Sequence, residues 1–207
     1  MKVFAIALNT FREAIRNKIL YSIIFFACLV VAIASIFGSF SIGNQVKFVK
    51  DFTLMSVSLF GAVIAIVLGV NLLHKELERR TILNVLSKPV SRWEFIAGKF
   101  LGLATTVSLI VLLMAIILIG ILAAFEGRPD WGLFLATFTT LLELIIIIAI
   151  AIFFSSIVVT PSLAGLFTAA AFVSGRSAGY LQFFFTEEHP PVVRGVARTL
   201  YALLPHL

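Results

Sequence analysis

The sequence predicts an all-α, polytopic membrane protein, and its composition and charge pattern support that prediction. Hydrophobic residues make up 61% of the 207 residues and charged residues only 13%, whereas a soluble domain has about 25% charged residues. The stretches 52–73 and 100–125 carry no charge. Each is long enough to cross a bilayer as a helix, which takes about 20 apolar residues. The +6 net charge flanks these stretches, so membrane topology explains it better than nucleic-acid binding.

The first 18 residues predict an amphipathic helix instead of a span. Apolar side chains recur at helical spacing on one face, and polar or charged ones occupy the other. The apolar face consists of Val3, Phe4, Ala7, Leu8, Phe11, Ala14 and Ile15. A helix of this kind lies in the membrane interface, so residues 1–18 are expected to form an interfacial helix that leads into the first span.

Residues 19–185 form the predicted membrane domain. Pro161 separates its last two spans, because a single helix over 131–185 would be about 82 Å long at 1.5 Å per residue, far more than a bilayer needs. Proline suits the first turn of the new helix, where its missing N–H costs nothing. The five expected spans are 19–41, 52–74, 95–125, 131–158 and 160–185.

Basic residues predict the orientation of these spans. Ten Lys and Arg residues lie in the N-terminal segment and in the connection around 75–99, on one side of the membrane, against three on the other side. The positive-inside rule places the richer side in the cytoplasm. The N-terminus and the charged connection are therefore expected to be cytoplasmic.

The charged connection over 75–92 contains helix stop and start signals, which predict a folded segment that projects from the membrane. Pro89 ends a short helix, because the residue before a proline avoids the α region. Ser91 and Glu94 have the spacing of a capping box that starts the next helix, and Trp93 suits the membrane interface. This pattern favours a docking surface for a soluble partner, although an ordinary solvated loop is the alternative.

Small residues recur at four-residue spacing, which lets helix backbones approach closely. One stripe on the second span consists of Gly61, Ala65 and Gly69, and a pair at Gly98 and Gly102 begins the third span. Either packing within one subunit or a seam between two copies would use such stripes. We expect a two-fold dimer, with the stripe at Gly61, Ala65 and Gly69 as part of its seam.

Two charged residues fall inside the predicted spans. Glu143 lies near the middle of the fourth span and Arg176 in the fifth. A carboxylate in hydrocarbon is costly, so Glu143 is expected to face protein or water. Three interpretations are open: a structural role, paired or protonated in the helix bundle; a role in a substrate or proton path; or a position shallower in the membrane than the residue count suggests. Arg176 lies nearer the outer end, so pairing with Glu143 would need a favourable offset.

The sequence gives no sign of covalent chemistry. It has no G-x-x-x-x-G-K-[ST] phosphate-binding loop, no HExxH and only one cysteine, and its three histidines are scattered. We therefore expect no metal, no cofactor and no catalytic site in this chain.

Several segments resemble ABC-2-type ABC transporter permeases. The similarity begins at 9–20, continues through 76–82, 86–92 and 94–100, and includes Leu142–Glu143 and 154–156. Within that family, the segments look most like the permeases annotated with multicopper-enzyme maturation, of the nitrous-oxide-reductase accessory type. The resemblance implies an N-terminal elbow helix, six spans, a homodimer, and two cytoplasmic ATPase subunits that bind ATP and Mg. It also implies that the 75–92 segment couples to the ATPase through Glu76, Glu78, Arg79, Arg80, Thr81, Ile82 and Lys88.

These features predict the transmembrane permease subunit of an ATP-driven exporter, which lies in the cell membrane among lipids and hydrolyses no ATP itself. Only five spans are visible, so residues 186–207 are expected to form an outer amphipathic segment that leads toward a sixth span missing from this sequence. Two other hypotheses remain: a non-transporting membrane scaffold or assembly factor, and an intramembrane enzyme that uses Glu143 or His189. The sequence does not define the substrate.

Overall fold

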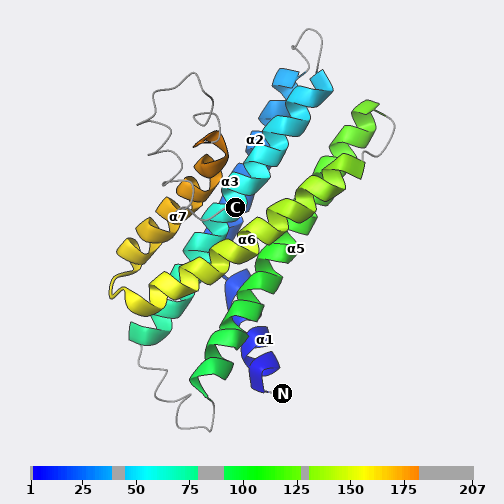
Figure 1. Cartoon of the computed structure of the whole chain (residues 1–207). Helices are drawn as coiled ribbons and strands as arrows, with labels where there is room; N and C mark the ends of the chain where they lie inside the picture. The colour runs from blue at the N-terminus through cyan, green and yellow to red at the C-terminus, as the bar shows by residue number, and fades with distance from the viewer. Residues whose placement is uncertain (1, 39–44, 79–90, 127–130, 182–207) are drawn as a thin grey trace, which may run out of the picture.

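Helices make up every element in the part of the chain that the structure describes (Figure 1). The computed structural model describes residues 2–38, 45–78, 91–126 and 131–181. Its elements are α1 (Lys2–Ile15), α2 (Lys18–Gly38), α3 (Gln45–Glu78), α5 (Arg92–Glu126), α6 (Trp131–Ile157) and α7 (Pro161–Leu181). The prediction of an all-α fold is confirmed.

Three of these helices contain segments long and apolar enough to cross a membrane: Lys50–Leu72, Arg92–Ile117 and Gly132–Ile157. They correspond to the second, third and fourth expected spans, and they support a polytopic membrane protein. The α2 and α7 helices cover the first and fifth expected spans. The total of five spans stays a prediction.

The α3 helix is the centre of the bundle, because it packs against α2, α5, α6 and α7. Figure 1 shows α3, α5 and α6 as long rods that cross one another, with α7 beside α3. Apolar side chains from these three rods form the core and exclude solvent almost completely. The largest are Ile64 and Leu68 of α3, Leu103, Val107 and Val111 of α5, and Leu144, Ile147 and Ile148 of α6.

The small-residue stripe on α3 packs against α6 of the same subunit. A methyl group added at Gly69 would lie 2.7 Å from Ala151 Cβ, one added at Gly61 would lie 2.5 Å from Leu144 Cδ1, and Ala65 between them is fully buried. The stripe therefore brings two helices of one subunit together. Packing within one subunit, the first of the two uses considered above, accounts for these contacts. The two-fold dimer and the position of its seam stay predictions.

The predicted helix over residues 1–18 is present as α1, and one side of it packs on α5. Methyl groups added at Gly98 and Gly102 would lie within 2.7 Å of Ile6 Cβ and Thr10 Cβ, respectively. The pair at Gly98 and Gly102 therefore seats α1 within the subunit. On the other edge of the apolar face, the Phe4 side chain is 73% exposed, which leaves it free to contact lipid.

Local signals set the starts of α2, α5 and α7, and those of α5 and α7 were predicted from the sequence. The Ser91 amide donates to Glu94 Oε2 at 2.8 Å, and the Glu94 amide donates to Ser91 Oγ at 3.2 Å, which is the reciprocal geometry of a capping box. Pro161 is the first residue of α7 after a short turn. Asn17 was not singled out in advance: its Oδ1 accepts from the Ile19 amide at 3.1 Å and caps α2.

Candidate functional site

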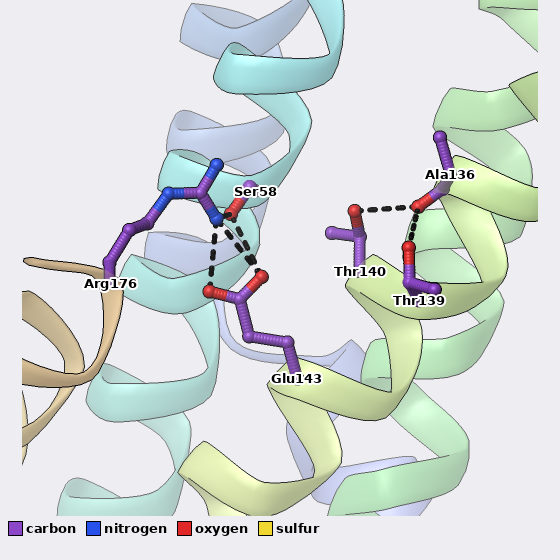
Figure 2. A network of polar contacts seen from close by, with 6 residues as sticks. All are labelled: Ser58, Ala136, Thr139, Thr140, Glu143 and Arg176. Atoms are coloured by element: carbon purple, nitrogen blue, oxygen red, sulfur yellow. Dashed lines mark hydrogen bonds and ion pairs between the residues drawn. The ribbon is translucent and has the colours of Figure 1, made fainter. Parts of the chain in front are cut away.

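A charged pair links α6 to α7 inside the bundle. Arg176 Nη1 donates to Glu143 Oε1 and Oε2, each at 3.0 Å. Figure 2 shows the two side chains reaching toward each other from α6 and α7. The Glu143 side chain is only 12% exposed, whereas that of Arg176 is 47% exposed. The carboxylate is therefore shielded by protein, as expected, and its partner is the nearest intramembrane base.

The helical hairpin supplies the offset that this pair needs. Glu143 lies 14 residues before Ile157, the end of α6, and Arg176 lies 15 residues after Pro161, the start of α7. At 1.5 Å per residue, both therefore lie about 21–23 Å along their helices from the turn that joins them. The equal spacing on either side of Pro161 is therefore a sequence signal for the pair, although the pair was not predicted from it.

Ser58 of α3 completes the network. Its Oγ accepts from Arg176 Nη1 at 2.7 Å and donates to Glu143 Oε2 at 3.4 Å. The residue is 2% exposed, so its hydroxyl is committed to this network. Ser58 therefore ties the α6–α7 pair to the central helix. Ser58 was not predicted from the sequence, because a lone serine in a membrane helix carries no pattern of its own.

The network forms one wall of a polar cavity of about 410 Å³ between α3, α6 and α7. Residues from one face of each helix line it: Asp51, Leu54 and Met55 of α3, Ala136, Thr139, Thr140 and Glu143 of α6, and Arg176 of α7. The hydroxyls of Thr139 and Thr140 donate to the Ala136 carbonyl at 2.8 Å and 2.9 Å (Figure 2). Their oxygen lone pairs stay available as acceptors.

The lining of the cavity is suited to binding a polar group, and it does not suggest covalent chemistry. Two carboxylates and one guanidinium line the cavity, and the Arg176 side chain is half exposed. Within the ranges that the structure describes, no group of three His, Cys, Asp or Glu side chains could hold a metal. A guanidinium at this depth needs water or a polar ligand beside it, so the cavity is a place where a hydrophilic group can enter the bundle.

The structure describes only two of the predicted coupling residues. Glu76 and Glu78 belong to the last turn of α3. Arg79, Arg80, Thr81, Ile82 and Lys88 lie outside the described residues. Their role in coupling stays a prediction.

A family comparison identifies the class of membrane protein to which these helices belong. The sequence profile of the family described as ABC-2 family transporter protein matches residues 4–175, from α1 to the last turns of α7. The chain belongs to this family. It is therefore a membrane permease component of an ABC transporter, and not the catalytic component. No curated protein matches the chain significantly.

Proposed function

We propose that this ABC-2 permease is the transmembrane subunit of an ATP-driven exporter. In the complete transporter, two copies of it pair in the cell membrane, with their N-termini in the cytoplasm. Two cytoplasmic ATPase subunits bind ATP and Mg and hydrolyse the nucleotide. The family match over residues 4–175 carries this proposal, and the three candidate spans support it. This proposal does not name a substrate.

Coupling is proposed to run through α3. This helix is continuous from Gln45 to Glu78, so its end in the charged 75–92 segment and Ser58 lie on one rod. The distance from Glu78 to Ser58 is about 30 Å along the helix at 1.5 Å per residue. Closure of the ATPases would push on the 75–92 segment and shift α3 against α6 and α7. The polar cavity lies at that interface, so its shape would change during each cycle.

The main role proposed for the Glu143–Arg176 pair is structural. With Ser58, it holds α6 and α7 against α3 at the depth where an isolated charge would be most costly. The same pair lines the cavity, which favours a second role for it as part of the route of a hydrophilic substrate.

The coupling proposal is tested by replacing Glu78 and Arg80 with Ala in the complex of permease and ATPase. The matched control is Glu126→Ala/Arg128→Ala, which removes the same residue types at the same spacing on the opposite side of the predicted topology. The Glu78→Ala/Arg80→Ala variant should insert normally but lose most of its transport-linked ATP hydrolysis, and the control should keep it. Normal hydrolysis in both variants would refute coupling through these residues.

The narrower resemblance to the multicopper-enzyme maturation branch also stays a proposal. The exporter proposal itself, in this branch or any other, predicts an ATPase gene with a Walker A motif beside the gene for this chain. A chain that binds this ATPase but moves no substrate in vesicles would instead fit the membrane scaffold alternative.

A further inference from the structure

A second cavity, of about 790 Å³, lies where α1, α2 and α3 meet. It is at a membrane boundary, because Leu72 ends the candidate span of α3 and Lys18 begins α2. Polar and basic side chains dominate its lining, which consists of Asn9, Arg12, Glu13, Arg16, Asn17, Lys18, Asn71 and Leu72. None of these residues belongs to the Glu143–Arg176 network.

Among the described residues that line the cavity, three are basic and one is acidic. Arg12, Arg16 and Lys18 are exposed, and no ion pair joins them to any other side chain in the described ranges. The carboxylate of Glu13 lies 4.0 Å from Lys99 Nζ, and the Lys99 side chain is 3% exposed. Because Glu13 already faces a buried cation, it does little to neutralise the three basic side chains at the cavity.

Apolar side chains border the basic cavity on the same two helices. Phe4 and Leu8 precede Arg12 at four-residue spacing on α1, so the three form one row, and both apolar side chains are exposed. Just after Lys18, Ile19 and Tyr21 of α2 are also exposed. A basic, hydrogen-bonding cavity beside an exposed apolar surface matches a molecule that has an anionic head and an apolar tail.

We propose that this cavity binds the headgroup of an anionic phospholipid. Arg12, Arg16 and Lys18 would contact the phosphodiester, for which guanidinium groups are well suited. The acyl chains would then run along the exposed apolar side chains of α1 and α2. Basic cavities at the ends of membrane helices recognise anionic lipids by this chemistry. The lipid would join α1 to the ends of α2 and α3, and this inference does not depend on which substrate the transporter moves.

The test measures lipid binding to the full permease by native mass spectrometry, in neutral detergent, with phosphatidylglycerol or phosphatidylcholine added. The wild type should bind phosphatidylglycerol more tightly. Arg12→Gln/Arg16→Gln should lower that affinity about 25-fold, because each basic residue near a membrane surface contributes roughly 1 kcal/mol, or about fivefold. Arg12→Lys/Arg16→Lys keeps the charge and should stay within about fivefold of the wild type. Arg92→Gln removes an exposed basic residue at the start of α5 and should bind like the wild type.

Three results would overturn the proposal. The first is equal binding of both lipids by the wild type, and the second is a glutamine variant that binds phosphatidylglycerol as tightly as the wild type. The third is displacement of the lipid by millimolar inorganic phosphate, which would make the cavity a site for a free anion. If the glutamine variant does not fold, the wild type alone decides the question. A phosphatidylglycerol with a photoreactive headgroup should then label a peptide containing residues 9–18, and labelling elsewhere would exclude the cavity.

Discussion

Breaking the Glu143–Arg176 pair should reveal how strongly it holds the bundle together. Among the described residues, Arg176→Gln leaves the Glu143 carboxylate, 12% exposed, with the Ser58 hydroxyl at 3.4 Å as its remaining partner. Removing one partner of a fully buried pair costs about 3–5 kcal/mol. Because the Arg176 side chain is 47% exposed and solvent screens the pair, we expect a loss of about 2 kcal/mol.

The reciprocal change should be milder. Glu143→Gln keeps an amide oxygen that can accept from Arg176, and the guanidinium can turn toward the cavity, so we expect a loss of about 1 kcal/mol. Combining Glu143→Gln with Arg176→Gln removes both charges together. The double variant should lose about 1 kcal/mol in total, so its loss would be about 2 kcal/mol smaller than the sum of the two single losses.

The free energy of unfolding would be measured by titrating SDS into mixed micelles and following helicity by circular dichroism. Lys47→Gln changes an exposed basic residue near the start of α3 and should shift stability by less than about 0.5 kcal/mol. Additivity of the two single variants to within about 0.5 kcal/mol would refute the coupling. A Glu143→Gln protein with normal stability and normal basal ATPase activity, but no transport, would make the route of the substrate its main role.

Two further changes test how the helices pack and begin. Gly69→Ala places a methyl group 2.7 Å from Ala151 Cβ, which cannot rotate away, so it should destabilise the bundle by about 1–3 kcal/mol in the SDS titration. Gly165→Ala has open space around it and should be neutral or stabilising; equal effects of the two changes would contradict the proposed contact between α3 and α6. Ser91→Ala removes the hydroxyl that accepts from the Glu94 amide and should cost about 1 kcal/mol, and an unchanged midpoint of unfolding would show that this capping box does not stabilise α5.

Local chemistry explains why the helix starts could be predicted from sequence. The start of α7 depends on Pro161 and the start of α5 on the Ser91–Glu94 box, and each signal is contained in a few consecutive residues. The sequence pattern of residues 1–18 likewise gave α1, since amphipathic periodicity needs no tertiary information.

Partner choice between helices could not be predicted in the same way. Four-residue spacing identifies a close-packing face at Gly61 and Gly69, but it does not say whether the neighbour is α6 or a second subunit. Ser58 gave no signal because its role depends on two helices that lie far along the chain. The pairing of Glu143 with Arg176 was an intermediate case, because equal distances from one tight turn place both side chains at one depth.

The central claim, that this permease is driven by a cytoplasmic ATPase, predicts direct contact at the 75–92 segment. A photo-crosslinking amino acid would be placed at Thr81, and at Lys47 as the control, in membranes that also contain the ATPase. Lys47 lies near the start of α3, at the end away from the charged segment. A permease driven through the 75–92 segment should give an ATPase cross-link from Thr81 and none from Lys47. A cross-link from Lys47 with none from Thr81, or no cross-link from Thr81 while the ATPase stays bound, would contradict it.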